Sequence, residues 1–223
     1  MQGTFKLDAT KFKSAVAQLA NLAKTKPVQT VMRQAAGQVV KRVVSVTPPA
    51  KGKADAAAKK AGETTIENDI AKLMVPAAAR IKRKLSDPAS LHARARDGRT
   101  GRVKRGSKVR AAVVKAELLA LRRSLKLAVG TLAAGWNAAA QELGVKLPAW
   151  ITRHGTKHGI IKIDVSKNGI RIYLANDVGF VDNIPDLERR LQWAVNVVAK
   201  NIIEKQLPNA VKNAGRKAGF KVR

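Results

Sequence analysis

The most regular pattern of apolar and polar positions in this chain lies between Ala111 and Gly144. Apolar residues recur there every three or four positions for roughly four heptads, the spacing of one face of an α-helix. The pattern predicts a long central helix that ends at Gly144, with Gly130 and Gly135 weakening it locally or admitting another backbone. The stripe fits either a core within one chain or a contact between subunits. Its members are Val114, Leu118, Leu121, Leu125, Ala128, Leu132, Trp136, Ala139 and Leu143.

Two shorter apolar stripes precede it. A short strand is predicted over residues 3–8, and Asp8 is a suitable N-cap for a helix that follows. Pro27 suits the first turn of a second helix, which must end by Thr47 because two prolines come next. The break at residues 24–27 predicts that these two helices form an antiparallel hairpin. Their stripes are Phe12, Ala15, Val16, Leu19 and Ala23, then Val28, Met32, Ala35, Val39, Val43 and Val46.

The segment 50–63 is rich in alanine, lysine and glycine and has no large apolar residue, so it is predicted to be a linker or a loosely held arm. Thr64 and Glu67 have the spacing of a capping box, which predicts that a helix starts there and continues to Pro76. The apolar face of this short helix consists of Ile66, Ile70, Leu73 and Met74.

A β-hairpin is predicted over residues 160–174. Apolar and polar residues alternate on both sides of Asn168-Gly169, a pair that supplies the positive φ angles of a tight turn. A closing helix is predicted to begin near Asn183 and to be ended or bent by Pro208, before a basic tail over residues 213–223 that is expected to be mobile. The buried stripe of this helix is Leu187, Leu191, Ala194, Val198 and Ile202.

These elements predict an α+β fold: mainly helical with a long central helix, one late β-hairpin packed on helices, and basic extended loops. Four regions are expected. Residues 1–46 hold the N-terminal strand and helical hairpin, and residues 47–110 hold the linker, a short helix and a basic arm. Residues 111–207 form the core together with residues 9–46, and residues 208–223 are the basic tail.

Charge adds information about partners. The chain has 44 Lys or Arg residues against 15 Asp or Glu residues, a net charge of +29 that favours an acidic or polyanionic neighbour. Its densest part, residues 92–110, is predicted to be an exposed arm that is either merely solvated or in contact with a polyanion or partner protein. No aromatic residue is interleaved there, so base stacking and sequence reading are not indicated. The candidate contact residues are Arg94, Arg96, Arg99, Arg102, Lys104, Arg105, Lys108 and Arg110.

Catalytic chemistry is not indicated. The chain has no cysteine, no GxSxG nucleophile elbow and no P-loop order in its glycine-rich basic stretch. His154 and His158 are four apart, but adjoining glycines favour a loop over a metal-binding helix. Glu63, Glu67 and Asp69 are explained by helix capping and the helix dipole. We therefore expect a protein that is not an enzyme and that needs no metal or cofactor.

The segment TPPAKGKADAAAKKAGETTIENDI (47–70) and the later GWNAAAQELGVKLPAWITRHG (135–155) resemble tailed-bacteriophage neck proteins, related to HK97-type tail-completion proteins. The similarity consists of short motifs and segment order from about residue 28 to residue 205, and the basic insertion near 86–110 departs from it. The resemblance implies a homo-oligomeric ring at the head–tail junction of the virion, made in the host cytoplasm. Its partners would be portal or adaptor proteins, tail proteins and, non-specifically, the DNA that passes through.

Two surfaces are expected to serve such a ring: the basic residues just named, and an oligomer contact made by the central stripe and the hairpin. The alternative is a cellular nucleic-acid-binding protein that is nucleoid-like or ribosome-associated, which the charge alone supports. No signal peptide or membrane span is seen, so a soluble protein is expected. The predicted oligomer contacts are Val114, Leu118, Leu121, Leu125, Leu132, Trp136, Ile161, Ile163, Ile170 and Ile172.

Overall fold

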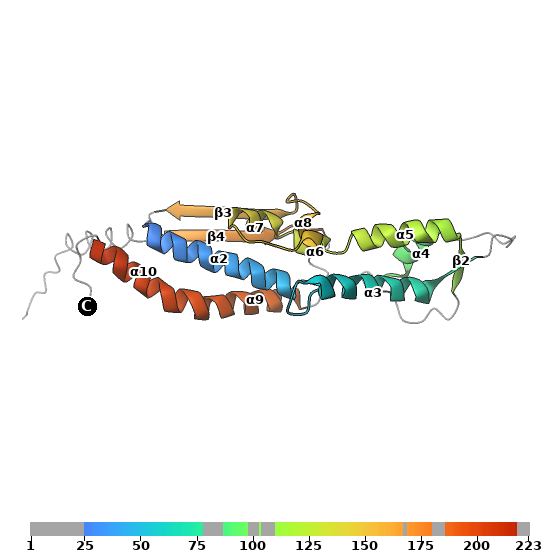
Figure 1. Ribbon diagram of the computed structural model, residues 1–223, viewed down its shortest axis with the longest axis horizontal. Helices are drawn as coiled ribbons and strands as arrows, with labels where there is room; N and C mark the ends of the chain where they lie inside the picture. Colours follow the sequence, from blue (N-terminus) through green and yellow to red (C-terminus); the bar gives the residue numbers. More distant parts are fainter. Residues whose placement is uncertain are drawn as a thin grey trace, which may run out of the picture.

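The computed structural model is elongated and consists of two parts (Figure 1). It describes residues 25–77, 87–97, 103, 110–166, 169–179 and 186–217. One part, the body, contains α2, α6 to α10 and the β3–β4 hairpin; the other, the lobe, contains α3, α4, α5 and the short strands β1 and β2 and projects from one end of the body. Each part has its own hydrophobic cluster. The predicted strand 3–8, the first predicted helix, and the predicted helix start at Asn183 lie outside the described residues.

The body is layered around α2 (Lys26–Val46), which lies between the hairpin on one side and the C-terminal helices on the other (Figure 1). Val40 and Val44 of α2 are 0% and 1% exposed. The predicted end of this helix is confirmed, because Thr47 has an extended backbone and its hydroxyl donates a hydrogen bond to the carbonyl of Val43 at 2.7 Å. The C-terminal layer consists of α9 (Leu187–Val198), the π-helical turn η2 (Ala199–Ile203) and α10 (Glu204–Lys217).

The predicted hairpin is confirmed. Strands β3 (Gly159–Ser166) and β4 (Gly169–Asn176) are antiparallel, with Ile161 opposite Leu174 and Ile163 opposite Ile172. Since alternate residues of a strand point to opposite faces, this register collects Ile161, Ile163, Val165, Ile170, Ile172 and Leu174 on one face. Ile160, Lys162 and Tyr173 lie on the other. Ile161 and Leu174 pack against the core of the body. The α+β class and the mainly helical content are therefore as predicted.

The long central helix is not continuous. It is divided into α5 (Lys115–Leu127), α6 (Thr131–Ala134) and α7 (Asn137–Glu142), followed by α8 (Ala149–Thr152). The break falls at Gly130, whose φ of +104° is incompatible with a right-handed helix. The Trp150 carbonyl packs against this glycine: an added Cβ there would lie 2.7 Å from the Trp150 oxygen. The prediction of one long helix was wrong because a tertiary contact uses the glycine to turn the chain.

Residues 56–63 of the segment predicted as a linker are helical. Helix α3 (Ala56–Leu73) begins after Asp55, whose carboxylate accepts a hydrogen bond from the Ala58 N–H at 3.0 Å. Thr64, predicted to be the N-cap, lies inside this helix. The small residues of its first half permit close packing, since a Cβ on Gly62 would lie 3.0 Å from both Pro49 and Val129 side chains. Tertiary contacts therefore replace the large apolar side chains that the sequence lacks here.

The lobe is organised around α3, α5 and a short parallel pair of strands, β1 (Met74–Pro76) and β2 (Ala111–Val113). Its cluster contains Ile70 and Val113, both 0% exposed, with Leu118 of α5. Helix α4 (Pro88–Ala95) packs on α3 and α5 and is capped by Asp87, whose carboxylate accepts from the Ser90 N–H at 2.7 Å. The prediction of an extended arm from residue 92 was thus wrong for residues 92–95, which are helical.

The C-terminal helix continues past Pro208, which the sequence predicted would end or bend it. Helix α10 includes this proline and runs to Lys217, so residues 213–217 of the predicted mobile tail are helical. The buried residues Ala210, Ala214 and Gly215 lie in the part of α10 that follows the proline, and α10 packs along α2. This packing offsets the hydrogen bond that the proline cannot donate.

Candidate functional site

The body carries an open apolar groove of about 400 Å³ between α2, β4 and the α9–η2 segment. Residues of α2, β4, α9 and η2 line it, together with Trp136. No charged side chain lines it, so the groove suits apolar groups and offers little for orienting a charged ligand. The lining residues are Met32, Ala35, Ala36, Val39, Val43, Trp136, Ile172, Tyr173, Leu174, Leu191, Val195, Val198, Ala199 and Ile203.

Large apolar side chains are exposed beside this groove. On the hairpin, Tyr173 is 57% and Val165 is 41% exposed; on α9, Trp193 is 49% and Val195 is 44% exposed. The guanidinium carbon of Arg42 lies 5.8 Å from the centre of the Trp193 ring, which fixes one face of that ring by a cation–π contact. Sequence reasoning missed Trp193. The available signal was that it falls off the stripe formed by Leu187, Leu191, Ala194 and Val198.

The residues predicted to make the oligomer contact divide into two groups. Leu118, Leu132 and Trp136 are 3%, 6% and 6% exposed. Leu118 belongs to the cluster of the lobe and Trp136 to that of the body. Their assignment to an oligomer surface is corrected, because folding of one chain already buries them. The others are half-buried: Val114, Leu121, Leu125, Ile161, Ile163, Ile170 and Ile172.

The predicted basic contact residues belong to the chain segment between strands β1 and β2 of the lobe. The segment 77–110 leaves β1 and returns to β2, and it holds twelve Lys or Arg residues against two acids. Arg94 lies on α4, Arg96 pairs with Val103 in an antiparallel bridge, and Arg110 directly precedes β2. Arg99, Arg102, Lys104, Arg105 and Lys108 lie outside the described residues.

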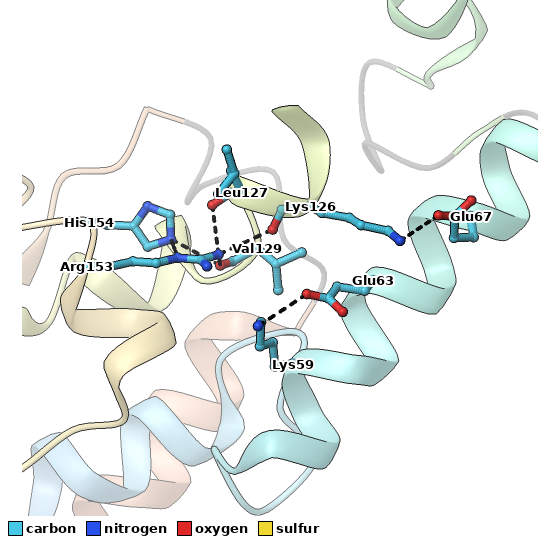
Figure 2. Close-up of polar contacts among 8 residues, drawn as sticks. All are labelled: Lys59, Glu63, Glu67, Lys126, Leu127, Val129, Arg153 and His154. Atoms are coloured by element: carbon cyan, nitrogen blue, oxygen red, sulfur yellow. Dashed lines mark hydrogen bonds and ion pairs between the residues drawn. The ribbon is translucent and has the colours of Figure 1, made fainter. Parts of the chain in front are cut away.

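A polar cluster joins the lobe to the body (Figure 2). Arg153, just after α8, donates from Nη2 to the carbonyls of Lys126, Leu127 and Val129 at 3.3, 2.9 and 3.0 Å. A cation at this position caps the C-terminal end of α5, where free carbonyls carry partial negative charge. His154 Nε2 lies 3.0 Å from the Val129 carbonyl oxygen. The body thus holds the end of the helix that runs out into the lobe.

The acids near this junction form ion pairs. Glu67 of α3 lies 2.7 Å from the Lys126 ammonium and 3.2 Å from the Arg122 guanidinium, so it links α3 to α5. The hydrogen bond from Lys126 lowers the pKa of the Glu67 carboxyl, and the Arg122 charge adds to this against the opposing effect of burial. Glu63 pairs with Lys59 at 3.5 Å and Asp69 with Lys72 at 3.6 Å. These ion pairs join α3 to α5 and link side chains within α3.

His92 lies on the inner face of α4 and is only 5% exposed, with no hydrogen-bond partner for its Nε2 atom. Burial lowers the pKa of the imidazole, and the positive charge of Arg96 lowers it further, while Asp69 opposes both effects. The side chain is therefore held neutral inside the lobe, and its position makes it a packing residue rather than a polyanion contact.

The two loop histidines are separated by their surroundings. His154 faces Val129, while His158 Nδ1 lies 3.9 Å from an Asp177 carboxylate oxygen, and both of these side chains are exposed. Within the described ranges, no group of three or more His, Cys, Asp or Glu residues could hold a metal ion. No helix in the part of the chain that the structure describes has the length and hydropathy to cross a membrane.

No known family model matches this chain, and neither the curated proteins nor the solved structures contain a significantly similar one.

Proposed function

We propose that this protein is a non-enzymatic structural component of a tailed-bacteriophage particle that forms a homo-oligomeric ring at the head–tail junction. The ring would join the capsid portal to the tail and let DNA pass. The segment order that resembles neck and tail-completion proteins motivates this proposal. The observation that carries it is the arrangement of the chain as a body with exposed apolar side chains and a projecting lobe whose strands β1 and β2 flank the basic segment 77–110.

In such a ring the body would supply the contacts between subunits. Val165 and Tyr173 of the hairpin and Trp193 of α9 expose apolar area that a monomer would leave in water. Exposed apolar surface of this kind marks interaction sites, and burying it contributes about 25 cal/mol per Å². The lobes would extend from the ring and present their basic segments to DNA or to acidic neighbouring proteins. Assembly would also distribute the +29 charge of each subunit over a particle that contains polyanionic DNA.

The direct test is to locate the protein in particles. Immunogold labelling of purified phage particles should place the protein at the neck, and negative-stain images of the isolated protein should show rings. Label that is absent from particles and coats cellular DNA instead would reject the proposal and favour a nucleoid-like protein.

A pair of variants tests the assembly surface. Val165→Asp places a charge in the exposed apolar area of the hairpin, whereas Lys51→Gln changes an exposed lysine between α2 and α3, away from the hairpin. Light scattering should show that Val165→Asp loses the oligomer while Lys51→Gln keeps it, with far-UV circular dichroism unchanged in both. Equal oligomer mass for the two variants would exclude Val165 from the interface.

A further inference from the structure

Strand β3 forms an outer edge of the hairpin. Figure 1 shows β3 along the margin of the body, whereas β4 contacts α2. In the part of the chain that the structure describes, β4 is the only strand paired with β3. Helix α7 packs against β3 near its first residue, where a Cβ on Gly159 would meet the Gly135 carbonyl and the Ala138 side chain. The C-terminal half of β3 extends beyond α7 in Figure 1, so a further strand can approach this edge.

The hydrogen-bond pattern of the hairpin shows which backbone groups point outward at the edge. In antiparallel strands, hydrogen-bonded pairs alternate with pairs that are not bonded to each other. The Asp177 N–H donates to the His158 carbonyl at 3.4 Å, so the even-numbered residues of β3 bond to β4. The N–H and C=O groups of the odd-numbered residues Ile161, Ile163 and Val165 point away from β4 instead. Within the described ranges, no backbone hydrogen bond joins these groups to another element.

The exposed face of β3 carries two opposite charges, Lys162 and Asp164. A lysine on an edge strand normally hinders pairing between copies, because the two lysines can meet. Two antiparallel copies of β3 can be centred on Lys162, Ile163 or Asp164. Centring on Lys162 or on Asp164 places like charges directly opposite each other, which is destabilising. Centring on Ile163 places Lys162 of each copy opposite Asp164 of the other, so this register is the one that the charges favour.

The register centred on Ile163 also suits the apolar face and the backbone. It places Ile163 opposite itself and Ile161 opposite Val165, so that β-branched side chains meet across the contact. These are the residues whose N–H and C=O groups point outward, so the opposed pairs can exchange about six hydrogen bonds in all. The edge of β3 is therefore self-complementary in its charges, its apolar side chains and its backbone groups.

We propose that β3 is a docking edge for a second copy of this chain, which pairs antiparallel about a two-fold axis at Ile163. The contact joins two hairpins into one continuous sheet, and a sheet of more than two strands is more stable than a single hairpin. Such a contact is isologous and closes at two subunits, so a ring needs a separate contact, for which Tyr173 and Trp193 are exposed. The inference goes beyond the proposed function and does not rest on it.

Disulfide trapping of the full chain determines the register, because the protein has no cysteine of its own. Lys162→Cys and Asp164→Cys are mixed, with a size tag on one of them, and oxidised mildly. In the proposed register these two positions form a non-hydrogen-bonded pair with Cα atoms about 4.5 Å apart, which is within disulfide range. The mixed dimer should form at least about tenfold faster than either homodimer, because identical positions lie about 7–8 Å apart on the diagonal.

The matched control is a mixture of Lys51→Cys with Asp164→Cys, because Lys51 is an exposed lysine away from the hairpin. This mixture should give no excess of mixed dimer. Equal yields of mixed dimer in the two mixtures overturn the proposal. Faster self-linking of Lys162→Cys, or of Asp164→Cys, also overturns it, since that result moves the two-fold axis to the linked residue.

Charge reversal tests the same pairs without a covalent link. Lys162→Asp and Asp164→Lys each place like charges opposite each other and should raise the dimer dissociation constant at least about tenfold, measured by sedimentation velocity. An equimolar mixture restores opposite charges at both pairs and should form a one-to-one dimer again. Both chains keep a large positive net charge, so general attraction does not produce this result.

Asp164 lies opposite Arg171 within its own hairpin, so far-UV circular dichroism of Asp164→Lys must first match that of the parent. The Lys162→Asp variant, which lies opposite Tyr173, provides the same test without a second charge on β4. If the mixture associates no more tightly than the separate variants, or if Lys162→Asp dimerises as the parent does, the two-fold contact through β3 is rejected.

Discussion

His92 makes the stability of the lobe sensitive to acid. The folded lobe holds the imidazole neutral with a lowered pKa, whereas the unfolded chain titrates at the ordinary value near 6.5. As the pH falls below that value, the unfolded state binds a proton that the folded state rejects. The free energy of unfolding therefore decreases on acidification, and the loss continues until the pH reaches the lowered pKa of the folded state.

Replacing this residue tests the sign of the effect. His92→Leu should lose less stability than the parent protein between pH 7.5 and 5.5, measured by denaturant unfolding at each pH. His158→Gln is the control, because its side chain is 39% exposed and lies outside the lobe. A pH dependence that is the same in His92→Leu as in the parent would show that His92 does not carry it.

Arg153 is the second residue whose effect can be predicted. Arg153→Met keeps part of the aliphatic stem but removes the donor to the Lys126, Leu127 and Val129 carbonyls. The loss should cost about 1 kcal/mol and increase amide hydrogen exchange in the last turn of α5, where the end of the helix is no longer held. Arg123→Met changes an exposed arginine of α5 itself and should leave exchange in that turn unchanged. Matching exchange in the two variants would contradict the capping role.

At the scale of elements, the break between α5 and α6 depends on Gly130. An alanine at this position would have to adopt a φ of +104°, and its Cβ would lie 2.7 Å from the Trp150 carbonyl oxygen. Gly130→Ala should therefore lower the free energy of unfolding by at least about 2 kcal/mol. Gly144→Ala has a positive φ of +66° but open space around its Cβ. Gly144→Ala should therefore lower the free energy of unfolding, measured by chemical denaturation, by only about 1 kcal/mol. Equal costs would mean that the contact with Trp150 contributes nothing.

The elements that sequence patterns predict well are those whose determinants are local. The end of α2 follows from Thr47 and the prolines after it, and the hairpin follows from alternating isoleucines around Asn168-Gly169, of which Asn168 lies outside the described residues. Both rest on backbone restrictions that are independent of the rest of the chain.

The central helix and α3 were mispredicted for a shared physical reason. Gly130 in a periodic stripe looks like a tolerated weak point until Trp150, twenty residues later, is known to occupy the space beside it. In α3, alanines and Gly62 look like linker composition until Pro49 and Val129 are known to pack against them. In a sequence, small residues indicate a flexible segment, but in a folded protein they can also permit close packing. Only the residues that pack against them show which of these two roles they have.

At the scale of the whole molecule, the candidate surfaces were only partly predictable. The basic residues could be found by counting charge, but their connection to the end of a separate lobe depends on the parallel pairing of β1 with β2. The predicted apolar contact residues could not be divided into core and surface, because Leu118 and Leu121 look alike in the same stripe. Leu118 is 3% exposed and belongs to the core of the lobe, whereas Leu121 is half-buried. Burial is a property of the packed chain, so a periodic pattern cannot assign it.

The separation of body and lobe predicts where polyanion binding is located. If the basic segment of the lobe contacts phosphates, replacing Arg99, Arg102, Lys104, Arg105 and Lys108 by Gln removes up to five contacts. For duplex DNA the slope of log K against log salt should then become shallower by up to about 4.5, since each contact contributes about 0.9. The measurement is fluorescence anisotropy of random-sequence duplex at several salt concentrations.

The control keeps the charge change and moves it to exposed positions outside the lobe, with Gln at Lys41, Lys51, Lys53, Lys157 and Lys200. Both variants lose five positive charges, so a general effect of net charge would reduce the two slopes equally. If the salt dependence becomes shallower only in the lobe variant, the DNA contact is assigned to the lobe. The reason is that the slope measures how many counterions are released from contacted phosphates and not the total charge of the protein. Equal slopes would show that the whole +29 surface attracts DNA without a preferred site.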